Sequence, residues 1–252
     1  MSGPATDPIG RHDDDLPISL VSLVVPAYNE VKRIVTTINE IDAYFAAKPY
    51  DAEVIVSADG DDGTRELVAT LAATNPRLQV IGSRERRGKG YGIRQGVAVA
   101  RGEVIGFVDA DNKTPIAEFD KVEPYLRSGW DVVIGSRALT GSRVEQAQPA
   151  YRRAGSKLFA LGMHALVGLH GITDTQCGFK FFRRRAALDV FSRQRIDGYM
   201  FDVEVLHLAT QRGYRIAEVP VRWRDDGDSR LQPVRGSARI LVDLLRIRFR
   251  RD

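Results

Sequence analysis

The chain has 252 residues, of which 43% are hydrophobic and 28% charged, a composition typical of a globular protein that buries one large core. The single cysteine, Cys177, excludes an internal disulfide and favours a reducing compartment, and the four histidines lack the spacing of a zinc site. The formal net charge of +4 allows anionic partners such as phosphates, nucleic acid or acidic lipid without selecting among them.

Apolar runs and helical patterns alternate through the first half of the chain. Residues 1–16, rich in Pro, Gly and Asp, predict a disordered lead-in, and residues 17–233 form the folded domain. The predicted strands are Ile18–Val25, Ala52–Ser57, Leu78–Ile81, Val104–Val108 and Asp131–Ile134. The predicted helices are Val31–Ala47, Thr64–Ala73, Gly90–Ala100 and Ile116–Leu126. This alternation predicts an α/β fold with a mostly parallel sheet and helices on both faces.

The second half of the chain does not continue the regular alternation of strands and helices. We expect a helix over Tyr151–His170, a second helix over Asp202–Gln211 and a strand over Tyr214–Trp223. Residues 234–252 predict a basic amphipathic helix, because arginines there alternate with leucine and isoleucine. The pattern indicates a nucleotide-binding half followed by an elaborated half on the same sheet.

Two carboxylates, Asp109 and Asp111, follow the buried run Val104–Val108. Side chains alternate faces in an extended segment, so these two project to the same side at the strand's end. An open α/β sheet binds its ligand at this edge, and carboxylate oxygens suit a hard divalent cation. Turn chemistry alone also favours Asp after a strand, so the pair by itself leaves both interpretations open.

Three loops have the character of a nucleotide site. The segment Pro26–Glu30 enters a helix whose N-terminus can face a phosphate, or it is a strand-to-helix turn capped by Asn29. Asp59 can accept hydrogen bonds from a base or ribose, or lie in a plain Asp/Gly turn. The segment Arg86–Gly92 suits a pyrophosphate, or is a solvated basic loop. It matches neither a Walker loop nor a dinucleotide-binding turn, which argues against an ATPase and a dehydrogenase.

A second group of polar residues lies further along the chain. Arg137 closes the fifth predicted strand, and Arg152 and Ser156 open the apolar helix; together they suit a second phosphate or form a surface cluster. Asp202 and Glu204 lie near a helix start, where simple complementation of the helix dipole is a strong alternative. The polar loop that begins at residue 174 runs into a buried strand, and periodicity does not explain it.

Eight motifs in order carry a family resemblance over about Ser19–Arg250. They are Val-Pro-Ala-Tyr-Asn-Glu, Asp-Gly-x-Asp-Gly-Thr, Arg-Gly-Lys-Gly, Asp-Ala-Asp, Gly-Ser-Arg, Asp-Thr-Gln-Cys-Gly-Phe-Lys, Phe-Asp-Val-Glu and Asp-Leu-Leu-Arg-Ile-Arg. This series resembles glycosyltransferase family 2, and within it the dolichyl-phosphate β-glucosyltransferases and their bacterial polyprenyl-phosphate relatives. The resemblance implies a GT-A fold, a nucleotide-sugar donor, Mg²⁺ or Mn²⁺, and inversion at the anomeric carbon.

The resemblance also implies a role for each matching residue. The residues that would hold the nucleotide sugar are Pro26, Ala27, Tyr28, Glu30, Asp59, Lys89, Asp109 and Ala110. Asp109 and Asp111 would hold the metal. The residues that would seat the acceptor phosphate are Arg137, Arg152 and Ser156.

Two features bear on the choice of substrate. A phosphate acceptor is already anionic and needs no strong base, so Asp202 would orient the sugar; with a hydroxyl acceptor, Asp202 or Glu204 would have to act as base. Lys113 lies where the mannosyl branch often has a glutamine ligand, which argues mildly against GDP-mannose. We expect a UDP-linked hexose, glucose or an N-acetylhexosamine, with galactose also open.

Membrane contact is expected to be peripheral. No stretch approaches the run of about 18 apolar residues that a spanning helix needs, and residues 11–15 are unlike a signal peptide. We therefore expect a cytoplasmic protein that contacts the membrane's cytoplasmic face through the apolar helix and the basic C-terminal helix. The alternative is that both helices pack on the core or at an oligomer contact. No recognisable nucleic-acid module is present in the sequence, so nucleic acid is not expected as a partner.

Overall fold

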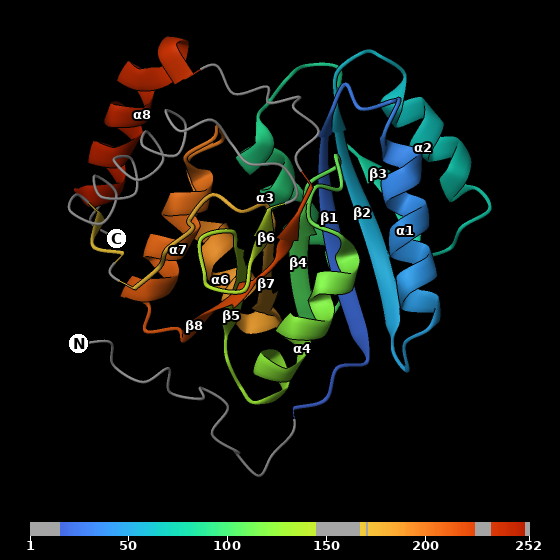
Figure 1. Cartoon of the computed structure of the whole chain (residues 1–252). Coiled ribbons are helices and arrows are strands. Elements are labelled where there is room, and N and C mark those ends of the chain that lie inside the picture. Colours follow the sequence, from blue (N-terminus) through green and yellow to red (C-terminus); the bar gives the residue numbers. More distant parts are fainter. Residues whose placement is uncertain (1–15, 145–166, 170, 225–232, 250–252) are drawn as a thin grey trace.

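A computed structural model describes residues 16–144, 167–169, 171–224 and 233–249 of the chain. Its main sheet consists of β1 (Leu20–Tyr28), β2 (Asp51–Asp59), β3 (Leu78–Ile81), β4 (Val104–Val108), β5 (Val132–Ser136), β7 (Phe179–Arg183) and β8 (Ile216–Pro220). The strands lie in the order β3-β2-β1-β4-β7-β5-β8 (Figure 1). A small second sheet pairs β6 (Arg143–Val144) with β9 (Arg222–Trp223).

The strand order places a switch point between β1 and β4. The chain moves outward in one direction from β1 to β2 and β3, and then returns to place β4 on the other side of β1. These four strands are parallel, so their carboxyl ends share one edge. Ligands of open α/β sheets bind outside such a switch point.

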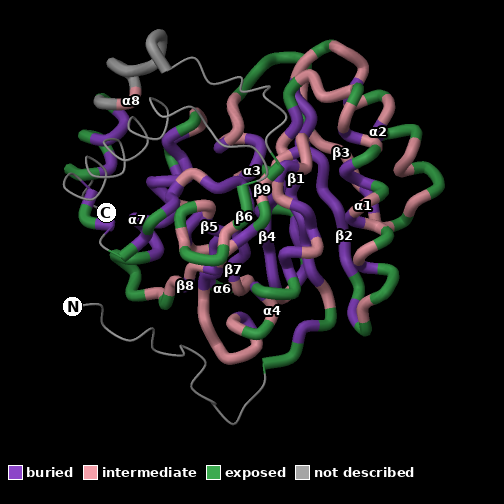
Figure 2. Tube along the Cα trace, viewed as in Figure 1, coloured by how far each residue is buried: buried purple, intermediate pink, exposed green. Residues whose placement is uncertain are grey.

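Helices cover both faces of the sheet. On one face lie α1 (Ile34–Ala46), α2 (Thr64–Ala72) and α4 (Phe119–Arg127), with the 3₁₀ turn η1 (Ile116–Glu118) before α4. On the other lie α3 (Lys89–Val99), α6 (Arg184–Arg193), α7 (Phe201–Gln211) and α8 (Pro233–Arg248). Figure 2 shows the buried strands between these two layers.

Alternation along β1 explains the two layers. Val21, Leu23 and Val25 belong to the apolar cluster with α1 and α4, whereas Val24 packs on the opposite side with α3. The second cluster contains aromatic side chains, including Phe107, whose ring centroid lies 5.6 Å from that of Phe201. Burial of these side chains stabilises both helix layers, at about 1.5–3 kcal/mol for each large apolar group.

The predicted α/β architecture with a mostly parallel sheet is confirmed. The strands Leu78–Ile81 and Val104–Val108 match their predicted bounds, and most other elements differ by one to four residues at an end. The helix α6 was not predicted, and the single predicted strand Tyr214–Trp223 is wrong. It divides into β8 and β9, which belong to different sheets. Residues 1–15 of the predicted lead-in over residues 1–16, and nearly all of the predicted helix Tyr151–His170, lie outside the described residues.

The strand β7 is the largest departure from the expected pattern. Its sequence was expected to form a buried strand, and it does, but it lies antiparallel between β4 and β5 in the middle of the sheet. Phe179, Phe181 and Phe182 are fully buried, and Lys180 is buried among them with 0% exposure. This central position brings the polar loop before β7 to the carboxyl end of β4.

The C-terminal helix α8 packs one face on the core. Leu244 and Ile247 are buried in the cluster with α3, α6 and α7. Val242, Leu245 and Phe249 are exposed, and their spacing places them together on another side of the helix. Within the described ranges, none of the helices has the length and apolar character needed to cross a bilayer.

Candidate active site

The predicted nucleotide residues meet at the carboxyl edge of the sheet. Tyr28 ends β1 and pairs in register with Asp59, which ends β2. Asp109 follows β4, the other neighbour of β1. Because the three strands are parallel, these side chains come from one edge at the switch point. Pro26 and Ala27 are the residues of β1 directly before Tyr28.

Asp109 is positioned by the loop before β7. Its backbone N–H donates to the carbonyl oxygen of Gly178 at 3.2 Å. A Cβ atom at position 178 would overlap the Asp109 carboxylate, so only glycine leaves that carboxylate in place. Lys89 lies 2.6 Å from Asp109 Oδ1. The sequence alone predicts no role for Gly178, and this contact supplies one.

Asp111 lies beside Asp109 in a confined position. Burial and the charge of Asp109 raise the pKa of Asp111 above its ordinary value. Lys113 Nζ lies 3.7 Å from Asp111 Oδ2. The two negatively charged carboxylates repel each other, and a divalent cation between them would relieve this repulsion. Carboxylate oxygens are the ligands that Mg²⁺ and Mn²⁺ prefer. The described residues therefore fit such an ion, although none of their clusters brings together three or more His, Cys, Asp or Glu side chains suited to metal binding.

Asp59 holds the loop beneath the expected base site. Its carboxylate accepts hydrogen bonds from the backbone N–H groups of Ser83, at 3.3 Å, and Arg87, at 2.8 Å. The guanidinium of Arg86 then lies 4.4 Å from the centroid of the Tyr28 ring. The arrangement forms an aromatic and cationic wall at the end of β1 and β2. Arg86 and Arg87 were predicted as part of a phosphate loop, and their stacking on aromatic rings was not.

The glycine-rich loop lies tightly against the segment before α7. A Cβ at Gly88 or Gly90 would overlap backbone oxygen atoms of Asp197 or Ile196, respectively. Arg94 Nη2 donates to Asp197 at 2.7 Å and secures the same contact. This close approach brings Lys89, at the start of α3, toward Asp109. Burial disfavours the ammonium group, but the charges of Asp109 and Asp202 outweigh burial and hold the pKa of Lys89 above its ordinary value.

Arg137, predicted to bind the acceptor phosphate, makes a bidentate pair with Asp174. Arg137 Nε and Nη2 donate to the two Asp174 oxygens at 2.7 and 2.9 Å, and the Arg137 backbone N–H donates to the same carboxylate. The guanidinium lies 5.5 Å from the centroid of the Trp223 ring. The other two predicted phosphate residues, Arg152 and Ser156, lie outside the described residues. Asp174 was not predicted, because its partner is far away in sequence.

Asp202 and Glu204 are turned into the protein. Asp202 is 1% exposed, and its Oδ1 lies 2.5 Å from the buried ammonium group of Lys180. Burial outweighs this ion pair and raises the pKa of Asp202 above its ordinary value. Glu204 is 2% exposed and accepts the backbone N–H groups of Arg195 and Ile196. Neither carboxylate has an exposed surface that a substrate hydroxyl could approach.

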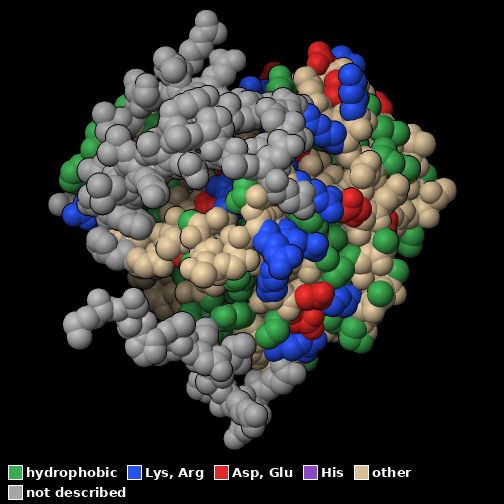
Figure 3. Space-filling view, viewed as in Figure 1, with side chains coloured by type: hydrophobic (Ala, Val, Ile, Leu, Met, Phe, Trp, Pro, Cys, Tyr) green, Lys and Arg blue, Asp and Glu red, His purple; other side chains and the backbone are tan. Residues whose placement is uncertain are grey.

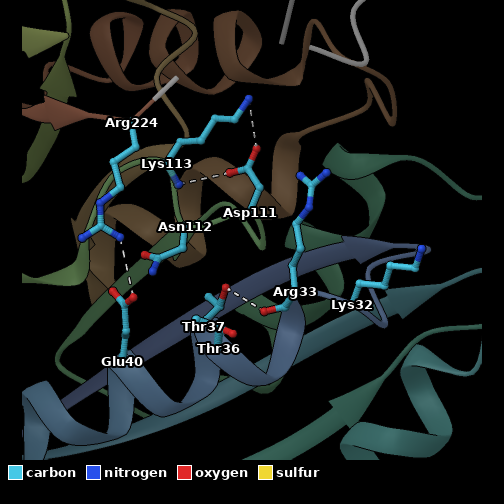
Figure 4. A pocket seen from close by; sticks show the side chains of 9 residues that line it. All are labelled: Lys32, Arg33, Thr36, Thr37, Glu40, Asp111, Asn112, Lys113 and Arg224. Atoms are coloured by element: carbon cyan, nitrogen blue, oxygen red, sulfur yellow. Dashed lines mark hydrogen bonds and ion pairs between the residues drawn. The ribbon is translucent and has the colours of Figure 1, made fainter. Parts of the chain in front are cut away.

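A cavity of about 240 Å³ has Asp111 in its lining. It lies between the start of α1 and the segment Asp111–Lys113, with Arg224 on a further wall (Figure 4). Thr37 fixes one wall, because its hydroxyl donates to the carbonyl oxygen of Ala110 at 2.7 Å. The sequence had not predicted this cavity.

Comparison with known proteins agrees with this arrangement. The family described as Glycosyl transferase family 2 matches residues 22–191. The chain is 38% identical over 240 residues to the dolichyl-phosphate beta-glucosyltransferase ALG5C of Trichomonas vaginalis, covering 90% of this chain and 70% of that protein. It is 35% identical over 256 residues to the human dolichyl-phosphate beta-glucosyltransferase, covering 94% and 77%.

Solved structures share the fold. Glucosyl-3-phosphoglycerate synthase from Mycobacterium tuberculosis, in complex with Mn²⁺, UDP and phosphoglyceric acid, superposes with a TM-score of 0.67 at 21% identity, covering 91% of this chain and 78% of that one. Mannosyl-3-phosphoglycerate synthase from Rubrobacter xylanophilus gives 0.68 at 19% identity, covering 92% and 74%. With its motifs, its GT-A fold and relatives above 30% identity, the chain is a glycosyltransferase that belongs to glycosyl transferase family 2.

Proposed function

We propose that the chain transfers a hexose, glucose in the first instance, from a UDP-linked donor to a polyprenyl phosphate, with inversion at the anomeric carbon. The observation that carries this proposal is the gathering of Tyr28, Asp59, Lys89 and Asp109 at one edge of the sheet, beside Asp111. The relatives named dolichyl-phosphate beta-glucosyltransferases support glucose and a polyprenyl-phosphate acceptor.

The donor side of the site supplies charge stabilisation. Tyr28 and Asp59 would contact the base and ribose, together with Pro26, Ala27, Glu30 and Ala110. Asp109 and Asp111 would hold Mg²⁺ or Mn²⁺, which when bound stabilises the charge that develops on the departing nucleoside diphosphate. Lys89 adds a fixed positive charge beside Asp109 and favours the same developing charge.

The acceptor side supports a phosphate rather than a hydroxyl group. A phosphate oxygen is already a competent nucleophile at neutral pH, whereas a hydroxyl acceptor needs a positioned base. Asp202 and Glu204, the residues that would have to act as base, are 1% and 2% exposed. Asp202 Oδ1 accepts a hydrogen bond from Lys180, and Glu204 accepts the Ile196 backbone N–H, while Asp202 Oδ2 is buried without a hydrogen-bond partner. Arg137, Arg152 and Ser156 remain our proposed phosphate ligands, with Asp174 holding Arg137 in place.

The reaction would take place at a membrane surface, where a polyprenyl phosphate resides. We place the protein at the cytoplasmic face, in peripheral contact through α8. The exposed side chains Val242, Leu245 and Phe249 support this placement, as do the neighbouring Arg246 and Arg248. The apolar segment before residue 167 was predicted to contribute as well, and it lies outside the described residues.

A transfer assay tests the proposal. Radiolabel is followed from UDP-glucose, UDP-galactose, UDP-N-acetylglucosamine and GDP-mannose into short-chain polyprenyl phosphate, with Mn²⁺ or a chelator. We expect a lipid product from UDP-glucose that requires Mn²⁺ and that Asp111→Ala does not form. A product from GDP-mannose alone would contradict the donor assignment, and a product that survives both the chelator and the variant would contradict the metal site.

A further inference from the structure

We propose that Trp223 is a positioning residue of the transfer site, and that its ring holds a cation of the acceptor side and a cation of the metal side in one arrangement. The guanidinium of Arg137 lies 5.5 Å from the centroid of the Trp223 ring, and Lys113 Nζ lies at the same distance from that centroid. Arg137 is the proposed phosphate ligand, and Lys113 lies 3.7 Å from Asp111, the proposed metal ligand. The inference rests on the proposed function, because it concerns how the two substrates of that reaction are held.

The backbone on both sides of Trp223 is fixed, so its ring has a defined place. The backbone N–H of Val221 donates to the carbonyl oxygen of Ser136, the last residue of β5, at 3.2 Å. The backbone N–H of Arg224 donates to the carbonyl oxygen of Lys113 at 2.8 Å. This short segment therefore joins the strand end that precedes the acceptor-side cation to the loop that carries the metal-side cation.

The two cations beside the ring have like charges, so their arrangement needs compensation. The negative face of an indole ring attracts each cation. Asp174 holds Arg137 through hydrogen bonds of 2.7 and 2.9 Å, and Asp111 lies beside Lys113. Each cation thus has its own carboxylate and shares the ring with the other cation. A displaced ring would therefore move two cations of the site rather than one.

The Trp223 ring lies outside the apolar core. Among the described residues, Trp223 belongs to neither apolar cluster, and it is half-buried. The other tryptophan, Trp130, packs against the first cluster, and its ring centroid lies 6.1 Å from that of Tyr125. Trp130 also lies beside a cation, since the guanidinium of Arg215 is 5.4 Å from its centroid. Trp130 precedes β5 whereas Arg137 follows it, so Trp130 is a matched control at the opposite end of that strand.

The surface near β6 and β9 is rich in cations. Figure 3 shows Lys and Arg side chains gathered over the middle of the molecule, next to a smaller acidic group, in the region where Figure 2 labels β6 and β9. Both substrates of the proposed reaction carry phosphate groups, and a positive surface favours their approach. A ring that orders cations at this place would act on the binding of both substrates.

Tryptophan fluorescence tests the proposal, because the chain has two tryptophans. Trp223 is the sole tryptophan of Trp130→Phe, and Trp130 is the sole tryptophan of Trp223→Phe. We expect the emission of Trp130→Phe to change saturably with UDP and Mn²⁺, and separately with a short-chain polyprenyl phosphate, since each ligand approaches a cation that contacts the ring. The polyprenol of the same length is the blank. The emission of Trp223→Phe should change with neither ligand. A response of Trp223 to only one ligand, or to neither while calorimetry shows both to bind, would overturn the proposal.

Binding affinities from calorimetry give a second readout. Trp223→Ala should weaken the binding of polyprenyl phosphate and of UDP with Mn²⁺ by about threefold to tenfold each, and Trp223→Phe, which keeps an aromatic face, should recover most of both losses. Trp130→Ala should lower the melting temperature and leave both affinities within about twofold of the wild type. A loss for one ligand only, or equal losses in Trp130→Ala, would contradict the positioning role.

The two readouts separate this inference from the proposed function. If the wild type binds neither ligand, the proposed function itself fails. If the wild type binds both ligands and the Trp223 variants bind them as tightly, only the positioning role fails. Should Trp223→Ala not fold, the fluorescence of Trp130→Phe decides, because that variant keeps the native Trp223.

Discussion

The Asp109 carboxylate depends on a residue that has no side chain. The carbonyl oxygen of Gly178 accepts a hydrogen bond from the backbone N–H of Asp109. The absence of a Cβ atom at Gly178 leaves the space that the Asp109 carboxylate occupies. The pair Asp109 and Asp111 was predictable from the sequence, because a carboxylate two residues after another at the end of an apolar run is a local pattern. The contribution of Gly178 was not predictable, because it depends on β7 lying next to β4.

Replacement of Gly178 by alanine tests this dependence. The new Cβ would displace the Asp109 carboxylate, so we expect Gly178→Ala to weaken Mn²⁺ binding in the presence of UDP by about tenfold or more. Titration calorimetry measures the effect. Gly198→Ala is the control, because a Cβ at that position meets nothing within 4 Å. Wild-type Mn²⁺ affinity in Gly178→Ala would contradict the assigned geometry.

The buried pair of Lys180 and Asp202 makes a second prediction at this scale. Both side chains are essentially unexposed, at 0% and 1%, so removal of one partner leaves an uncompensated charge in the core. We expect Lys180→Met to lower the free energy of unfolding by about 3–5 kcal/mol. The double variant Lys180→Met, Asp202→Leu should recover most of that loss in urea denaturation. If the double variant loses as much free energy of unfolding as the two single variants lose together, the interaction between Lys180 and Asp202 does not account for the loss.

At the scale of elements, one buried carboxylate joins β1, β2 and the turn before β4. Glu53 accepts the Ser22 hydroxyl at 2.6 Å and the Arg101 backbone N–H at 2.6 Å. Arg101 Nε donates to the other Glu53 oxygen at 2.8 Å. Burial alone would raise the pKa of Glu53, but these hydrogen bonds outweigh burial and hold the pKa below its ordinary value of 4.5.

The lowered pKa gives a pH-dependent stability. Glu53 stabilises the fold fully above pH 4.5, where it is ionised in both states, and this contribution is lost as the pH falls below 4.5 through the folded-state pKa. We expect Glu53→Gln to cost about 1–3 kcal/mol at pH 7 and progressively less toward pH 3. Urea unfolding of both proteins at several pH values measures the difference. Glu66→Gln, whose side chain is 62% exposed beside Arg65, should have little effect at any pH. A cost for Glu53→Gln that is constant with pH would contradict the assignment.

Local patterns predicted the elements of the first half well and those of the second half less well. The strands β1 to β4 lie next to their sequence neighbours or at the switch point, so periodicity and turn residues suffice. The position of β7 depends on pairing with β4 and β5, which are distant in sequence. Its buried Lys180 also conflicts with an apolar strand pattern until Asp202 is known to lie beside it. For the same reason the sequence named Arg137 but not its partner Asp174.

At the scale of the whole molecule, the C-terminal helix α8 presents two different sides. One side of α8 is committed to the core through Leu244 and Ile247. The other exposes Leu245 at 42% and Phe249 at 75%. The two predicted alternatives for this helix, core packing and contact with the membrane interface, therefore apply to different sides of it. Core packing is confirmed for the side with Leu244 and Ile247. The membrane part stays a prediction.

Two substitutions on the exposed side test membrane contact without disturbing the core. Leu245→Asp, Phe249→Asp should weaken binding to anionic liposomes by about tenfold or more, since each large apolar side chain contributes about 1.5–3 kcal/mol when buried. Liposome flotation measures binding, and the melting temperature should stay near that of the wild type. Leu188→Asp, at an exposed leucine of α6, is the control and should not change binding. Unaltered flotation of the double variant would remove α8 from the membrane interface.

The most direct test of the central claim is a choice between acceptors. The protein is incubated with UDP-glucose, Mn²⁺, a polyprenyl phosphate and the polyprenol of the same chain length, and the lipid products are identified by mass. Because Asp202 and Glu204 are buried and already hydrogen-bonded, we predict glucose only on the phosphate. Glucosylated polyprenol, or release of free glucose without any lipid product, would contradict the account.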